Sequence, residues 1–219
     1  MHRIAHRGCA GQYPENTLAA FRAAAPHVDA VELDVRRCGS GELVVIHDAR
    51  VDRVTDGTGA VRDHSLADLQ ALDVLDSGES VPTLAAVFDA VPDSVGVNAE
   101  LKESGLAGDV AEMANDVPHE VLVSSFDPGV LADVASHDPT LPTALLFSGN
   151  PDENVARASA LGCAAVHPVV EVCLHSDVVD RAHEAEMVVN AWTVADADTA
   201  AALAGAGVDG IITDRWDIT

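Results

Sequence analysis

The feature that most constrains this chain of 219 residues is the alternation of two kinds of segment along it. Short runs rich in β-branched residues alternate with Ala-rich segments of helical period, a pattern typical of βα units and a parallel sheet. The segments with an extended pattern are residues 2–6, 29–35, 43–47, 95–102, 120–125, 142–147, 163–167, 187–193 and 209–213. The segments with a helical pattern are residues 16–25, 83–90, 106–115, 128–136, 152–161, 176–185 and 196–205.

The number of extended segments indicates a closed barrel with one additional strand. Residues 43–47 follow 29–35 across Cys38-Gly39-Ser40-Gly41, which is too short for a crossover helix and favours an antiparallel hairpin. Without this strand the remaining segments fit the eight strands of a barrel. We therefore predict an α/β fold, a (β/α)8 TIM barrel with an extra hairpin strand near the N-terminus, in one domain over residues 1–219. An open doubly wound sheet is the alternative, but no Gly-rich phosphate-binding motif follows any strand.

The charge of the chain excludes several classes of partner. There are 36 acidic and 12 basic residues, a formal net charge of −24, and the only lysine is Lys102. Nucleic acids and anionic membranes require clustered Lys and Arg, so we expect neither a nucleic-acid partner nor stable membrane association. The N-terminus enters an extended segment at once and does not resemble a signal peptide, which favours a cytoplasmic protein. Dispersed negative charge is tolerable where salt screens it, so we interpret the chain as halophilic.

Carboxylates fall on strands that a parallel barrel buries on both faces. In residues 31–35, Glu32 and Asp34 point to one side, and in residues 97–102, Glu100 shares a face with Asn98 and Lys102. Three converging carboxylates could not all stay ionised without a cation. A hard divalent ion such as Mg²⁺ or Ca²⁺, bound by oxygen atoms, would satisfy them. The structural alternative is a set of strands with one face in water, which is ordinary for antiparallel sheets but unusual in a parallel barrel.

Histidine, arginine and lysine side chains lie at the C-terminal ends of predicted strands, where barrels carry their active sites. His6 and His47 each end an extended segment, so one ring could accept a proton while the other donates one. Arg7 offers a planar fork for phosphate oxygens, and Lys102 lies on the same strand face as Glu100. A hydrogen-bonded structural histidine and a solvated surface lysine are the alternatives.

Short motifs in a fixed order identify a family. The chain resembles the glycerophosphodiester phosphodiesterase family from about residue 3 to residue 215. The motifs that carry the resemblance are His6-Arg7-Gly8, Pro14-Glu15-Asn16-Thr17, Val31-Glu32-Leu33-Asp34-Val35, Val45-Ile46-His47-Asp48, Thr55-Asp56-Gly57-Thr58-Gly59, Val81-Pro82-Thr83-Leu84, Asn98-Ala99-Glu100-Leu101-Lys102, Ser124-Ser125-Phe126, Ala191-Trp192-Thr193-Val194 and Ile211-Ile212-Thr213-Asp214-Arg215.

The resemblance implies a role for each candidate residue. It implies catalytic roles for His6 and His47, a metal site at Glu32, Asp34 and Glu100, phosphate contacts from Arg7 and Lys102, and alcohol contacts from Trp192 and Phe126. Trp192 could equally be a core residue, and His167 could support the site from behind. Asn16 or Thr17 is interpreted as a helix cap, so Glu15 and Asn16 are left outside the chemistry.

The expected activity is metal-dependent hydrolysis of a small-molecule glycerophosphodiester to glycerol 3-phosphate and an alcohol, a step in lipid and glycerol metabolism. A lysophospholipase D-like or phosphatidylinositol-phospholipase-like activity is one alternative. It would need an apolar surface beside the barrel mouth, and nothing in the sequence resembles a membrane-docking stripe. A catalytically silent barrel that only binds phosphorylated ligands is another. The sequence leaves the oligomeric state open and is compatible with a homo-oligomer.

The charge leads to a prediction that does not depend on the activity. Because 36 acidic residues face only 12 basic ones, self-repulsion should destabilise the fold when counterions are few. We expect the melting temperature, followed by circular dichroism, to rise from low to molar KCl. A melting temperature that is flat or falls over this range contradicts the halophilic interpretation.

Overall fold

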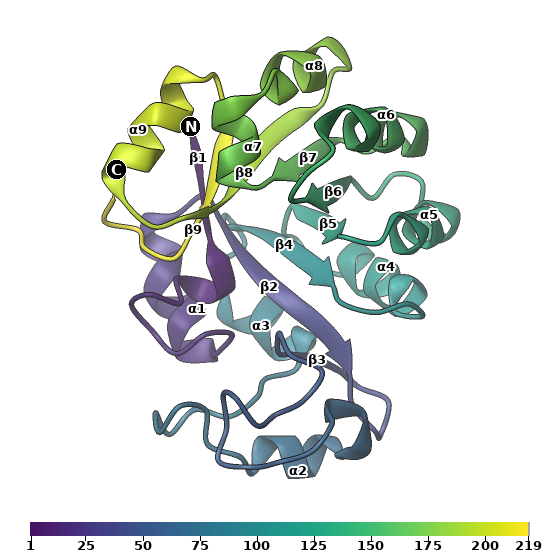
Figure 1. Cartoon of the computed structure of the whole chain (residues 1–219). Coiled ribbons are helices and arrows are strands. Elements are labelled where there is room, and N and C mark those ends of the chain that lie inside the picture. The colour runs from purple at the N-terminus through teal and green to yellow at the C-terminus, as the bar shows by residue number, and fades with distance from the viewer. Residues whose placement is uncertain (219) are drawn as a thin grey trace.

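Eight parallel strands close into a barrel in the computed structural model, which describes residues 1–218 (Figure 1). Thr219, the last residue of the predicted domain, lies outside the described residues. β1 pairs with β2 on one side and with β9 on the other, so the sheet has no free edge in the barrel. The barrel strands are β1 (His2–Ala5), β2 (Ala30–Arg37), β4 (Gly96–Leu101), β5 (Val121–Ser125), β6 (Thr143–Phe147), β7 (Ala165–Pro168), β8 (Val188–Val194) and β9 (Gly210–Thr213). The predicted barrel is confirmed, and the open-sheet alternative is wrong.

The ninth strand, β3 (Leu43–Val45), pairs antiparallel with the end of β2. Val45 lies opposite Val35 and Leu43 opposite Arg37. This confirms the predicted hairpin, and it leaves His47 just beyond a strand that extends outward from the barrel.

Helices surround the barrel on its outside (Figure 1). They are α1 (Leu18–Ala24), α3 (Leu84–Ala90), α4 (Ala107–Asn115), α5 (Pro128–His137), α6 (Pro151–Leu161), α7 (Val170–His175), α8 (Val178–Glu184) and α9 (Ala197–Gly205). α2 (Leu66–Gln70) instead lies apart from the barrel, in the segment between β3 and α3. None of the helices within residues 1–218 is long and apolar enough to cross a membrane.

The sequence did not predict two short helices. α2 has five residues and begins at a capping box in which Ser65 and Asp68 bond each other's backbone N–H groups. α7 has six residues and lies between β7 and α8, where the sequence predicted only the start of one helix at residue 176. Such short helices contain too few residues for their period to show in a sequence.

Alternation along the strands separates the core from the site. Val31, Leu33 and Val35 of β2 belong to a fully buried cluster that also contains residues of α1, α3 and α4. Glu32 and Asp34 alternate with them and point into the barrel, where they are also buried. A separate cluster of buried side chains, including Val51, Leu69 and Val74, holds residues 48–81 together beside β3.

Candidate active site

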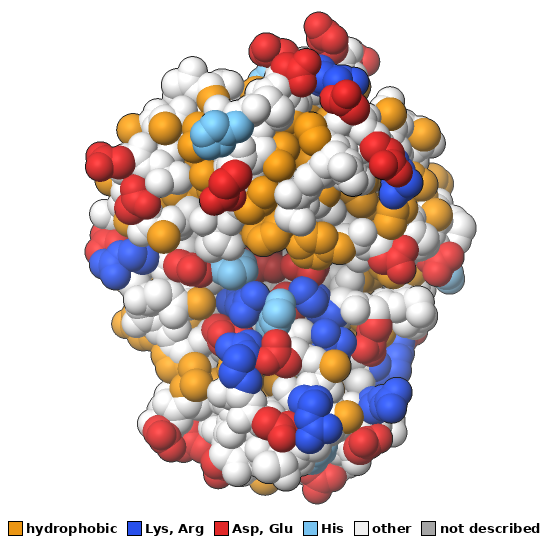
Figure 2. Space-filling view, viewed as in Figure 1, with side chains coloured by type: hydrophobic (Ala, Val, Ile, Leu, Met, Phe, Trp, Pro, Cys, Tyr) orange, Lys and Arg blue, Asp and Glu red, His pale blue; other side chains and the backbone are white. Residues whose placement is uncertain are grey.

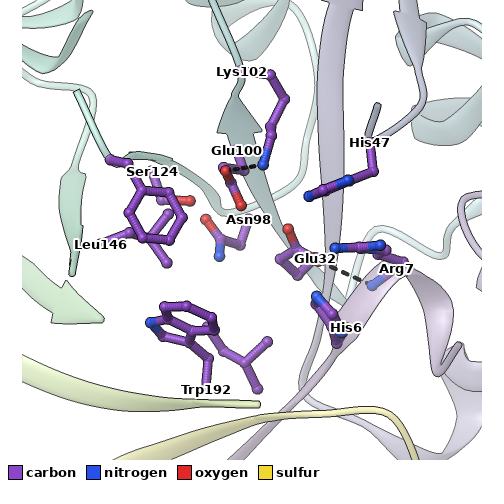
Figure 3. A pocket seen from close by; sticks show the side chains of 12 residues that line it. His6, Arg7, Glu32, His47, Asn98, Glu100, Lys102, Ser124, Leu146 and Trp192 are labelled. Carbon is purple, nitrogen blue, oxygen red and sulfur yellow. Dashed lines mark hydrogen bonds and ion pairs between the residues drawn. The ribbon is translucent and has the colours of Figure 1, made fainter. Parts of the chain in front are cut away.

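A pocket of about 210 Å³ opens at the C-terminal ends of the barrel strands (Figure 3). It contains all but one of the predicted site residues, and Asp34 lies directly behind it in contact with Arg7 and Lys102. The residues that line the pocket are His6, Arg7, Glu32, His47, Asn98, Glu100, Lys102, Ser124, Phe126, Leu146, Trp192 and Ile212.

Glu32, Asp34 and Glu100 converge as their alternation along β2 and β4 predicted. β2 and β4 are neighbours, with Asp34 directly beside Glu100, and one oxygen of each carboxylate lies within 4.8 Å of the others. Burial and the adjacent Asp34 charge raise the pKa of Glu32 to about 8, and the same two causes raise the pKa of Glu100. Three buried carboxylates this close together repel one another when all are ionised. Their oxygen atoms form a ligand set that fits a hard divalent cation.

Arg7 and Lys102 supply positive charge beside this trio. Arg7 Nε lies 3.2 Å from Asp34 Oδ2, and the Arg7 backbone N–H donates to Glu32 Oε2 at 2.9 Å. Lys102 Nζ lies 2.5 Å from Glu100 Oε1 and 3.4 Å from Asp34 Oδ1. Although burial alone would raise it, the pKa of Asp34 is lowered by these two cations. Asp34 is therefore the carboxylate of the trio most firmly held in its charged form.

Each predicted catalytic histidine is held by a carboxylate. His6 Nδ1 lies 2.6 Å from Asp214 Oδ1, and His47 Nδ1 lies 2.6 Å from Asp48 Oδ1. This pairing fixes each ring through Nδ1 and leaves Nε2 for a ligand, since both residues line the pocket.

The pKa values of the two imidazole rings are shifted in opposite directions. Burial opposes a charge on His6, but the Asp214 hydrogen bond and the nearby Glu32 carboxylate outweigh it and raise the pKa of His6 above 6.5. Burial lowers the pKa of His47 below 6.5, and the Asp34 and Asp48 carboxylates offset this only in part. Two titratable groups with diverging pKa values can divide an acid and a base role between them.

Trp192 and Phe126 form an aromatic edge to the pocket. Their rings meet edge to face with centroids 5.4 Å apart, and Trp192 Nε1 donates to the His167 backbone oxygen at 2.7 Å. Phe126 is 46% exposed, which is unusual for so large an apolar side chain. Figure 2 shows apolar side chains gathered on one side of the hollow and Lys, Arg and His side chains on the other.

His167 binds Trp192 through its backbone oxygen, which accepts the hydrogen bond from Trp192 Nε1. Its ring is fully buried below the pocket, where burial lowers its pKa to about 3. The prediction that His167 supports the site from behind therefore applies to its carbonyl group and not to its imidazole.

The sequence interpretation missed contacts made by Asn16 and Glu15. Thr17 is the cap of α1, because its hydroxyl accepts from the Ala20 N–H. Asn16, with a φ of 58°, instead donates from Nδ2 to Asp34 Oδ2 at 2.8 Å. Glu15 accepts from Arg7 Nη1 at 3.0 Å. The position of both residues within a family motif was the available signal, but the capping pattern supplied a simpler explanation.

Arg53 was also missed, and it connects the two sides of the site. Its guanidinium donates to both oxygens of Glu15 at 2.8 Å and to Asp48 Oδ2 at 2.5 Å. Because Glu15 binds Arg7 and Asp48 binds His47, one chain of ion pairs joins Arg7 to His47.

Known proteins provide an independent comparison. Residues 6–218 match the Glycerophosphoryl diester phosphodiesterase family. A glycerophosphodiester phosphodiesterase of Caldanaerobacter subterraneus subsp. tengcongensis is 35% identical over an alignment of 226 positions that spans 96% of this chain and 93% of the relative.

Solved structures of phosphodiesterases are also similar to this chain. An Oleispira antarctica phosphodiesterase in complex with the product sn-glycerol-3-phosphate is 30% identical, with a TM-score of 0.86 over 98% of this chain and 93% of that one. A glycerophosphodiester phosphodiesterase of Thermotoga maritima is 27% identical, with a TM-score of 0.87 over 99% and 96%. The chain therefore belongs to the glycerophosphoryl diester phosphodiesterase family, a family of phosphoric diester hydrolases, as its motifs predicted.

Proposed function

We propose that this protein hydrolyses glycerophosphodiesters to sn-glycerol 3-phosphate and an alcohol with the help of a divalent cation, Mg²⁺ or Ca²⁺. The observation that carries the proposal is the buried trio of Glu32, Asp34 and Glu100 in a pocket that also presents His6 and His47. A relative with 30% identity holds sn-glycerol-3-phosphate as its product, which supports the choice of substrate.

The charges of the site favour an anionic substrate once a cation is present. Three ionised carboxylates and the two cations Arg7 and Lys102 leave one net negative charge. Glu32, Asp34 and Glu100 would hold the divalent ion, which neutralises charge on a phosphoryl oxygen when bound. The loaded site would carry one net positive charge, suited to the single negative charge of a phosphodiester. Arg7 and Lys102 would bind the non-bridging oxygens and stabilise the charge that grows on them.

The histidines would exchange protons with the reacting oxygens. We assign the general base to His47, because its lowered pKa keeps Nε2 free to accept a proton from the attacking oxygen. This oxygen belongs to water, or to the neighbouring glycerol hydroxyl of the substrate, in which case water then opens the cyclic phosphate that forms. We assign the general acid to His6, because its raised pKa keeps a proton available for the leaving alcohol. Asp48 and Asp214 would stabilise the imidazolium forms and hold the rings in orientation.

The aromatic edge favours a second candidate substrate class, lysophospholipid-like diesters. Phe126 and Trp192 line the pocket with their rings edge to face, and Figure 2 shows apolar side chains on one side of the hollow, where an acyl chain could lie. A silent phosphate-binding barrel is disfavoured, because none of the predicted histidines and carboxylates is missing. Comparing hydrolysis of glycerophosphocholine, glycerophosphoethanolamine and lysophosphatidylcholine in high salt, with a metal series, tests these candidates. The single domain over residues 1–219, the cytoplasmic location and a homo-oligomer stay predictions.

Metal dependence is the first test of this site. A chelator should abolish turnover and Mg²⁺ or Ca²⁺ should restore it. Glu100→Gln should keep the melting temperature and weaken metal binding in calorimetry by at least about tenfold, because it removes one charged ligand. Glu103→Gln is the matched control, since Glu103 pairs with Arg36 outside the trio. Full turnover in excess chelator contradicts the proposal.

The histidine roles predict a bell-shaped pH profile of kcat/KM. Turnover should fall on the acidic side as His47 gains a proton, at a pH below 6.5, and on the alkaline side as His6 loses one, at a pH above 6.5. His6→Ala and His47→Ala should each lower turnover by about 10²–10⁴-fold. The double variant should lose less than the product of these factors, because both residues serve one reaction. A His47→Ala enzyme with nearly full activity, measured beside a His137→Ala control, would show that His47 is structural.

Lys102 provides the third test. Lys102→Met should lower turnover by about a hundredfold or more, because it removes a positive charge from a buried transition state. Metal binding should not weaken, since no ligand is lost. Lys102→Arg should recover only part of the rate, because a planar fork does not replace a compact ammonium. If Lys102→Met keeps more than half of the activity, Lys102 has no phosphate-binding role.

A further inference from the structure

The barrel has a second cavity, of about 530 Å³, at the end opposite the proposed active site. It is lined by residues at or just before the N-terminal ends of the strands, among them His2, Asp29, Gly96 and Asp209. The hydrolytic reaction proposed above uses none of these side chains.

Two glycines, Gly96 and Gly210, shape this cavity. A Cβ atom on Gly210 would lie 2.3 Å from Asn190 Oδ1 and 3.3 Å from His2 Cβ, so a larger residue there would displace the Asn190 amide. A Cβ atom on Gly96 would lie 3.3 Å from Ala30 Cβ. Glycine at position 96 therefore leaves room at the opening, and glycine at position 210 leaves the Asn190 amide in place.

The floor of the cavity is polar, buried and incompletely bonded. His167 Nε2 is paired with Asn190 Nδ2 at 3.1 Å, but His167 Nδ1 has no hydrogen-bond partner within residues 1–218. Neither amide atom of Asn98 has a partner there, although its side chain is almost fully buried. Buried polar groups in native proteins nearly always have partners, so His167 Nδ1 points to a polar ligand in this cavity, while the Asn98 amide, which lines both cavities, could bond a ligand in either. Burial keeps the His167 ring neutral, because it lowers the pKa to about 3.

The rim of the cavity is acidic. Asp29, Glu120 and Asp209 surround the opening, and no Lys or Arg is among its lining residues in the described part of the chain. Asp29 and Asp209 are held in position because each accepts a hydrogen bond from a backbone N–H, that of Arg3 and that of Val189 respectively. Asp209 also pairs with His183, whose Nε2 lies 2.9 Å from Asp209 Oδ2. An opening with three carboxylates and no Lys or Arg in its lining attracts cations and repels phosphorylated substrates.

We propose that this cavity is a second binding site, for a small organic cation that carries a hydroxyl group, such as an amino alcohol. The ammonium group would lie among the rim carboxylates, and the hydroxyl would reach the neutral floor, where Asn98 and His167 offer an amide oxygen and ring and amide N–H groups. Asn98 also lines the active-site pocket, so the site extends to within one side chain of it. The inference does not rest on the proposed hydrolytic function.

Ethanolamine is the probe for calorimetry on the full chain, at a fixed KCl concentration in which the protein is folded. We expect saturable binding with one site per chain. Ethylamine lacks the hydroxyl and ethylene glycol lacks the charge, so each should bind at least about tenfold more weakly if rim and floor both contribute. Absence of saturable ethanolamine binding, or binding of either analogue as tight as that of ethanolamine, overturns the proposal.

Two rim variants locate the site. Val188 is 45% exposed at the opening, so Val188→Trp should cover the cavity without disturbing the core. Glu120→Gln removes one charge and keeps the shape. Both should weaken ethanolamine binding by at least about tenfold while the melting temperature and turnover stay unchanged, and Glu112→Gln, on the surface of α4, should bind as wild type.

The active-site trio is the competing location for an amine. If Glu100→Gln abolishes ethanolamine binding, or if either rim variant binds within twofold of wild type, the amine occupies another site and the proposal is wrong. Should Val188→Trp fail to fold, Glu120→Gln alone decides the outcome, because it changes only the charge of an exposed side chain.

Discussion

Repulsion between three buried carboxylates is the interaction around which the mouth of this barrel is arranged. Glu32, Asp34 and Glu100 cannot share one dry space as anions unless positive charge is close by. Arg7 and Lys102 contact them directly, and Asn16 donates to the most firmly ionised of the three. These contacts offset most but not all of the negative charge, which leaves the site suited to gain a divalent cation and, with it, an anionic substrate.

The same contacts link the site to the fold. The Arg7 backbone has a positive φ of 49°, which aims its N–H at Glu32 while its side chain reaches Glu15. Arg53 then joins Glu15 to Asp48, which holds His47. Arg53 lies in the segment between β3 and α3, which has its own cluster of buried side chains. The position of a proposed catalytic base therefore depends on a small packed unit outside the barrel.

The sequence could predict what strand alternation determines. A parallel barrel buries both faces of its strands, so a period of two is enough to predict that Glu32, Asp34 and Glu100 share the inner face. The remaining contacts of the site depend on loop conformation and on closure of the barrel. Asp214 contacts His6 from 208 residues away, and Asn16 donates to Asp34 from a left-handed backbone position. Strand alternation does not encode such contacts.

The two ends of the barrel differ in charge, and the difference has a physical consequence. In a chain with 36 acidic and 12 basic residues, most of the surface repels a phosphodiester. At the C-terminal end the cations Arg7 and Lys102 point at the pocket, while the N-terminal opening is lined by Asp29, Glu120 and Asp209 without any Lys or Arg in the described chain. With a divalent cation held by Glu32, Asp34 and Glu100, the C-terminal end would attract an anion, whereas the N-terminal opening favours a cation. Asn98 lines both cavities, so a ligand that binds its amide at one end changes the hydrogen-bonding groups available at the other end.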